Sequence, residues 1–120
     1  MSQSHANLMR RIAETDATFV LKDVLWVGRC LICGGPLCFD ERTGDGATIE
    51  HILPRSLGGA NDLRNLGIAH VRCNNEKGRR WDPRRRHHAQ QDRFAALLQR
   101  MLAERERRWR EGPVDRERVS

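Results

Sequence analysis

Apolar residues near the start of the chain predict a helix followed by a short buried run. Leu8, Ile12 and Phe19 fall near helical spacing, so we expect a helix over residues 7–22. The apolar run at residues 24–27 either extends that helix or forms a buried strand. The pattern alone leaves both alternatives open.

The middle of the chain alternates short apolar runs with turn-forming residues. Residues 48–53 are predicted to form a strand that a proline stops, and residues 66–69 a second strand. A loop with a Gly-Gly turn separates them. The segment over about residues 70–81 is predicted to be helical and to end before Pro83. The order strand, loop, strand, helix predicts a ββα unit.

A longer amphipathic helix is predicted over about residues 88–110, because apolar residues recur there on one side and charged residues fill the rest. The apolar stripe consists of Phe94, Leu97, Leu98, Met101, Leu102 and Trp109. We interpret this stripe as core or dimer packing rather than as a ligand site.

The length of 120 residues suits one domain. We expect a small α+β fold with an N-terminal helical extension at residues 1–28 and a core at residues 29–82. A basic C-terminal helix at residues 83–111 and a disordered tail at residues 112–120 complete it. The lean hydrophobic content of 38% indicates that a structural metal would help such a small core.

Two ligand pairs supply that metal site. Cys30-x-x-Cys33 is followed by a Gly-Gly-Pro turn, and His70-x-x-Cys73 lies at the start of the helix of the ββα unit. Three thiolates and one imidazole are a typical closed, four-coordinate zinc site. The alternative is a redox pair or small core residues at Cys30 and Cys33, with a satisfied histidine. The remaining cysteine, Cys38, is expected to be a buried thiol.

The charge of the chain is distributed unevenly. The formal net charge is +6, and basic residues exceed acidic ones by seven within residues 72–120, whereas residues 1–71 carry a net charge of −1. A basic half suits a polyanionic partner, most simply nucleic acid. Arginine-rich codon usage is the alternative, because only Lys22 and Lys77 are lysines. We see no signal peptide and no apolar run of membrane-span length, and so expect a cytoplasmic protein with no membrane contact.

Read in order, these motifs resemble the HNH, or ββα-metal, endonucleases over about residues 29–79. They are C-x-x-C, an acidic residue with His-I-x-P-x-S-x-G-G, then N-L, and finally H-x-x-C-N-x-x-K-G. The resemblance implies a zinc-stabilised ββα-metal core. It also implies hydrolysis of DNA phosphodiester bonds that leaves 5′-phosphate and 3′-hydroxyl ends.

The resemblance also assigns the catalytic roles. His51 matches the general base, and an imidazole titrates near neutral pH. Asn65 matches the asparagine that holds the catalytic loop. Glu50 and Asn74 match the positions that hold one divalent cation, which makes this chain an H-N-N variant. Oxygen ligands favour Mg²⁺ or Mn²⁺ there, so we expect structural Zn²⁺ and a separate catalytic Mg²⁺ or Mn²⁺.

The basic residues that follow the site are the candidates for contacts with the DNA backbone, which position DNA without reading its sequence. They are Lys77, Arg79, Arg80, Arg84, Arg85 and Arg86. DNA is the expected partner, and a homodimer or a larger phage or recombination complex stays open. Two alternatives to the endonuclease are a non-catalytic, zinc-clamped nucleic-acid-binding module and an interaction subunit that docks through the last helix.

Overall fold

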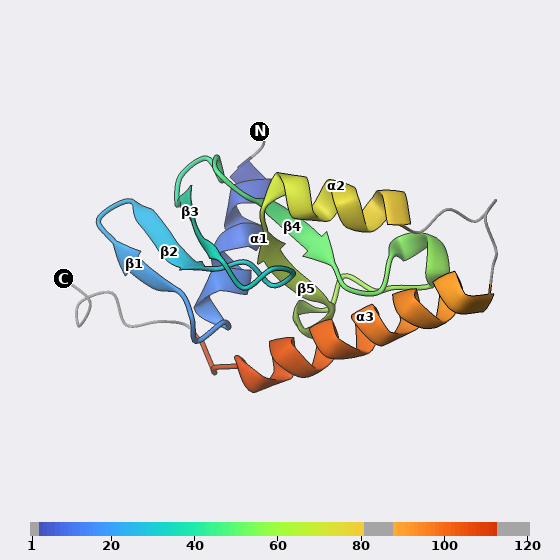
Figure 1. Cartoon of the computed structure of the whole chain (residues 1–120). Helices are drawn as coiled ribbons and strands as arrows, with labels where there is room; N and C mark the ends of the chain where they lie inside the picture. Colours follow the sequence, from blue (N-terminus) through green and yellow to red (C-terminus); the bar gives the residue numbers. More distant parts are fainter. Residues whose placement is uncertain (1–2, 81–87, 113–120) are drawn as a thin grey trace.

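A helix and a three-stranded antiparallel meander form the first part of the chain in a computed structural model, which describes residues 3–80 and 88–112. Helix α1 spans Gln3–Glu14. Strands β1 (Val20–Lys22), β2 (Leu25–Arg29) and β3 (Pro36–Asp40) pair in chain order, with Trp26 opposite both Leu21 and Phe39. Sheet and helix lie together at one end of the molecule (Figure 1).

The predicted first helix is too long, because it ends at Glu14 and not near residue 22. The Thr15 hydroxyl donates to the carbonyl oxygen of Ile12 at 2.9 Å, and Asp16 Oδ1 accepts from both the amide and the hydroxyl of Thr18 at 2.8 Å. Such local side-chain bonds compete with helical ones and turn the chain. The chain continues as β1, and the strand alternative for residues 24–27 is confirmed.

Strand β3 also corrects the expectation for Cys38. Successive side chains of a strand point to opposite faces, and here Leu37 and Phe39 are buried while Cys38 is exposed. Cys38 is therefore a surface thiol.

The ββα unit has the predicted order. Strands β4 (Thr48–His51) and β5 (Leu66–Ala69) pair antiparallel, and helix α2 (Val71–Arg80) follows directly. The connection between the strands contains two short 3₁₀ turns, η1 (Arg55–Leu57) and η2 (Leu63–Asn65). Helix α3 (His88–Arg107) runs along the other side of the strand pair from α2 (Figure 1). The α+β fold with a ββα core is confirmed.

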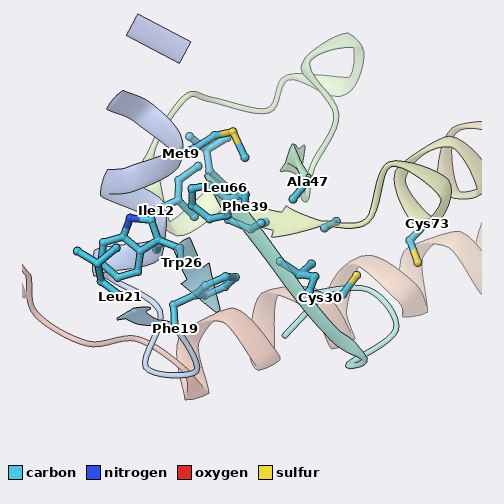
Figure 2. Close-up of a cluster of buried hydrophobic side chains, with 14 residues drawn as sticks. Met9, Ile12, Phe19, Leu21, Trp26, Cys30, Phe39, Ala47, Leu66 and Cys73 are labelled. Carbon is cyan, nitrogen blue, oxygen red and sulfur yellow. The ribbon is translucent and has the colours of Figure 1, made fainter. Parts of the chain in front are cut away.

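One hydrophobic core joins these parts. Met9 and Ile12 of α1 pack with Trp26 and Phe39 of the meander and with Leu66 of β5, all at 1% exposure or less. The Phe19 and Phe39 rings meet edge to face at 6.0 Å. Figure 2 shows Cys30 and Cys73 at the end of this cluster away from Leu21 and Trp26. The core thus ends directly at the predicted zinc ligands.

The apolar stripe of α3 belongs mostly to the interior of the monomer. Met101 packs with Leu31 and Ile52 in a second buried cluster, and Leu97 and Leu98 lie against it. Phe94 is buried as well, whereas Leu102 is 43% exposed. The interaction-subunit alternative needed this stripe to be exposed around Leu98 and Met101, and that requirement is not met.

Arginines at the end of α3 and just after it tie the chain together, and we call Arg105, Arg108 and Arg110 the arginine clamp. Arg105 donates to the carbonyl oxygens of Leu66 at 2.7 Å and Thr15 at 2.9 Å. Arg110 donates to the carbonyl oxygens of Ala13 and Glu14 at 2.9 Å and of Phe19 at 3.0 Å.

Arg108, the third member of the clamp, is also directed inward. It donates to the Arg29 carbonyl oxygen at 3.1 Å and lies 3.7 Å from the carboxylate of Asp16, which is 1% exposed. A share of the basic excess in the C-terminal half therefore bonds the protein's own backbone and is not available to a polyanion. Of the predicted disordered tail, residues 113–120 lie outside the described residues. No helix in the described ranges is long and apolar enough to cross a membrane.

Candidate metal centre and active site

The four predicted zinc ligands meet at one point. The Sγ atoms of Cys30, Cys33 and Cys73 and a ring nitrogen of His70 all lie within 4.8 Å of one another. His70 Nδ1 is 3.4 Å from Cys33 Sγ and 3.7 Å from Cys73 Sγ. Ligand atoms around a tetrahedral zinc, with bonds of about 2.3 Å to sulfur and about 2.0 Å to nitrogen, are about 3.5 Å apart. The spacing of this Cys3His cluster fits zinc.

The hydrogen bonds around the cluster favour the tautomer of the histidine and the thiolate form of the cysteines that bind a metal. His70 Nε2 lies 3.0 Å from the carbonyl oxygen of Pro36, which only accepts, so Nε2 carries the proton and Nδ1 is free to ligate. The amides of Ile32 and His70 donate to Cys30 Sγ at 3.4 Å, and that of Gly35 donates to Cys33 Sγ at 3.3 Å. These donors stabilise thiolates.

The thiols differ in their acidity without a metal. The Gly35 amide is the main cause that lowers the pKa of Cys33 to about 7, and burial raises the pKa of Cys73 to about 12. Zinc requires both as thiolates, so metal binding releases protons. The chemistry and spacing of the cluster therefore fit a closed structural zinc site.

The strand pair β4–β5 places the predicted catalytic residues beside this cluster. Glu50 pairs with Gly67 and His51 with Leu66, and α2 begins two residues after β5. Asn74 lies in the first turns of α2, where its amide donates to the His70 carbonyl oxygen at 3.0 Å. Glu50, His51 and Asn74 thereby line one cavity of about 500 Å³. Asn74, which is distant in the sequence from Glu50 and His51, therefore lies together with them in space.

Asn65 does not line the cavity but fixes the loop that borders it. Its Oδ1 accepts from the Leu53 amide at 2.9 Å, and its Nδ2 donates to the carbonyl oxygens of Leu53 at 3.1 Å and Ala60 at 2.9 Å. The Gly-Gly turn allows the close return of this loop, because Gly58 has a φ of 92° and a Cβ on Gly59 would lie 1.8 Å from the Leu53 oxygen.

The Glu50 carboxylate is only 2% exposed and forms an ion pair with Lys77, which is 5% exposed. The Lys77 ammonium also donates to the carbonyl oxygens of His51 at 2.8 Å and Ile52 at 2.9 Å, so all three of its donors are used. Burial raises the pKa of the Glu50 carboxyl, and Lys77 opposes that rise. The other oxygen, Oε2, is buried and has no hydrogen-bond partner among the described residues.

Comparison with known protein families supports the resemblance to the HNH endonucleases. A family model described as HNH endonuclease matches residues 30–90, which is half of the chain. The chain belongs to the HNH endonuclease family. No curated protein and no solved structure matches it. Membership indicates nuclease-type activity on nucleic acid. The matched range contains the Cys3His cluster and every described residue of the cavity wall except Phe94.

The predicted DNA-contact residues of this HNH protein fall into three groups. Lys77 faces the interior and not solvent, which differs from the expectation that it reaches a phosphate. Arg79 is exposed on α2, and Arg80 ends that helix. The run at residues 84–86 lies outside the described residues, so its role stays a prediction.

Sequence reasoning missed two residues near His51. Arg55 lies on the cavity wall, is exposed, and makes no ion pair within the part of the chain that the structure describes. Asn61 is exposed, and its Oδ1 lies 2.8 Å from His51 Nε2. Both belong to a polar loop in which no spacing pattern singles out one residue. The only signal available was their position between the general base and Asn65.

The buried pair predicts a stability effect in this HNH core. Lys77→Met leaves the Glu50 carboxylate buried without its counter-charge, and should lower the free energy of unfolding by about 3–5 kcal/mol. Urea denaturation followed by circular dichroism measures it. Arg79→Met, an exposed position on the same helix, is the matched control and should change stability by no more than about 0.5 kcal/mol.

The double variant Lys77→Met with Glu50→Gln separates charge from packing. Because both charges are then absent, it should recover much of the loss. A Lys77→Met protein as stable as the parent would show that the ammonium does not compensate the carboxylate.

Proposed function

We propose that this protein is a metal-dependent DNA endonuclease that hydrolyses phosphodiester bonds with His51 as general base. One observation carries the proposal: the imidazole of His51, the carboxylate of Glu50 and the amide of Asn74 line the same open cavity. A module that only binds nucleic acid has no need to bring these three groups together. Family membership supports the reaction class, and the charge of the exposed rim supports a polyanionic substrate.

The donor set at the cavity fits a hard divalent cation. Glu50 Oε2 is a buried, unpartnered carboxylate oxygen, and Asn74 supplies an amide oxygen on the facing helix. Mg²⁺ prefers oxygen ligands and keeps several waters, so Glu50 and Asn74 would hold Mg²⁺ or Mn²⁺ as the protein's share. When bound, such an ion neutralises charge on the scissile phosphate and stabilises the departing oxygen.

The chain's own residues supply the proton transfer and the positioning. His51 takes a proton from water as the water attacks phosphorus. Strand pairing and the Lys77 ammonium hold the backbone of His51, while Asn65 holds the loop that follows it. The scissile phosphate fits in the cavity between His51 and Arg55. Exposed Arg79 supports the approach of the DNA backbone.

Arg55 should contribute to DNA binding rather than to chemistry. Arg55→Ala should weaken binding to all sequences alike and reduce the salt slope of the affinity by about one, because one phosphate contact is lost. Fluorescence anisotropy with a short duplex over a salt series measures this. Arg42→Ala is the control. Arg42 lies on the loop after β3 and is also an arginine, but it pairs with Asp40 at the end of that strand. Equal slopes for the two variants would remove Arg55 from the interface.

The function itself is tested on supercoiled plasmid. The purified chain, exchanged into buffer without divalent cation, should leave the plasmid intact, and added Mg²⁺ or Mn²⁺ should produce nicked or linear DNA. Omitting the cation is preferable to adding chelator, which would also strip the Cys3His site. If DNA is bound but never cut under any of these conditions, the zinc-clamped binding module becomes the better interpretation.

A further inference from the structure

We infer that Asn61 is a positioning residue that sets which ring nitrogen of His51 acts as the base. The inference rests on the proposed function, since it assigns a role within the same site. Its starting point is the contact of 2.8 Å between Asn61 Oδ1 and His51 Nε2. The amide oxygen of asparagine only accepts hydrogen bonds, so the ring nitrogen facing it carries the proton. The lone pair of the neutral imidazole is then on Nδ1.

Asn61 is exposed, yet its backbone is held on both sides. The carbonyl oxygen of Ala60 accepts from Asn65 Nδ2 at 2.9 Å. On the other side Asp62 caps η2, where its carboxylate accepts from the Arg64 amide at 2.8 Å. An exposed side chain on a fixed backbone keeps one position more readily than one on a free loop. The contact to His51 is therefore built into the loop.

The backbone of His51 is fixed as well, so ring rotation is its main remaining freedom. His51 pairs with Leu66 in the strand ladder, and its carbonyl oxygen accepts from Lys77. The hydrogen bond to Asn61 restricts the rotation of the ring and at the same time selects its tautomer. Such a bond on the second nitrogen is how a neighbouring group fixes a functional histidine.

Asn61 acts through His51 and not on the substrate. His51 lines the cavity, but Asn61 is absent from the residues described as lining it. The amide thus contacts the ring without being part of the cavity wall that would hold the phosphate. It follows that Nδ1 is the nitrogen directed to the reacting water, and that loss of Asn61 should affect turnover more than DNA binding.

Three variants and a control test this with the full-length, zinc-loaded chain. Asn61→Ala should lower kcat for plasmid cleavage by about tenfold or more, with KM unchanged, because oriented acid–base groups contribute factors of this order. Asn61→Asp should keep most of the activity, since a carboxylate oxygen accepts the same proton, whereas Asn61→Leu should behave like alanine. Asn75→Ala, an exposed asparagine on α2, should match the parent.

Two further measurements separate positioning from other roles. In a His51→Ala background, Asn61→Ala should cause no additional loss, because its effect passes through the imidazole. Nitrogen-15 NMR of the histidine rings should show the Nε2–H tautomer for His51 in the parent and a mixture in Asn61→Ala. A parental kcat for Asn61→Ala, an additive loss in the double variant, or an unchanged tautomer would each overturn the inference.

The failure of this inference differs from failure of the proposed function. If His51→Ala cuts as well as the parent, the function is wrong whatever Asn61 does. If His51→Ala is inactive and Asn61→Ala is not, only the role of Asn61 is withdrawn.

Discussion

His51→Ala should lose plasmid cleavage by a factor of about 10² or more while keeping its fold, its zinc and its DNA affinity. General-base loss typically has this scale. The imidazole is half-buried at the cavity wall, its one hydrogen-bond partner that the structure describes is the exposed Asn61, and it is not part of the Cys3His cluster. The backbone bonds of His51 do not depend on the ring, so the strand pair should survive.

The measurement is a time course of nicking under excess Mg²⁺, with melting temperature and zinc content as controls. Glu50→Ala gives the contrast. It should also lose cleavage, but through weaker cation binding, so that excess Mn²⁺ restores part of the rate. The same excess should not rescue His51→Ala, which lacks the proton acceptor. Cleavage by His51→Ala at the parental rate, with contaminating nuclease excluded, would refute the mechanism.

Cys73→Ala should lose both the metal and cooperative unfolding. Cys73 is buried at 7% exposure and belongs at once to the hydrophobic core and to the Cys3His cluster. Structural zinc sites contribute apparent binding energies of about 10–16 kcal/mol, which is folding energy in small domains. We expect about one zinc per chain in the parent and none in the variant.

Elemental analysis and thermal unfolding measure the two effects together. Cys38→Ala is the matched control, because Cys38 is exposed on β3 and lies outside the cluster. It should retain zinc and melt like the parent. If Cys73→Ala retains a cooperative transition at the parental temperature, the site is not structural.

The zinc ligands and the ββα order could be predicted because both are local. Each ligand pair is presented by one short turn, and the apolar runs of β4 and β5 end at a proline and at His70. Strand β3 could not be predicted, because its residues 36–40 follow a turn signal and are paired only through β2. The same limit applies to the first helix, whose apolar spacing continues into residues that the Asp16 turn diverts.

Lys77 shows why charge alone misplaces a residue. Its spacing from Asn74 correctly set it one turn along the same helix, but its direction depends on Glu50, which is distant in sequence and buried. The same limit applies to the clamp arginines, which a count of charges assigns to the basic half although they bond backbone carbonyl oxygens. A count of charges does not distinguish a cation facing a phosphate from one facing a backbone carbonyl oxygen.

The arginine clamp also has a consequence for the order in which parts of this protein fold. Some of its bonds join residues 90 or more positions apart, such as those from Arg105 to Thr15 and from Arg110 to Phe19. Closing such distant contacts costs chain entropy before it is rewarded, so they form late in folding. Phe94, on the same helix, is a wall of the cavity. Because the last predicted zinc ligand, Cys73, precedes Phe94 in the chain, we expect a chain under synthesis to complete the Cys3His cluster before it completes the cavity wall.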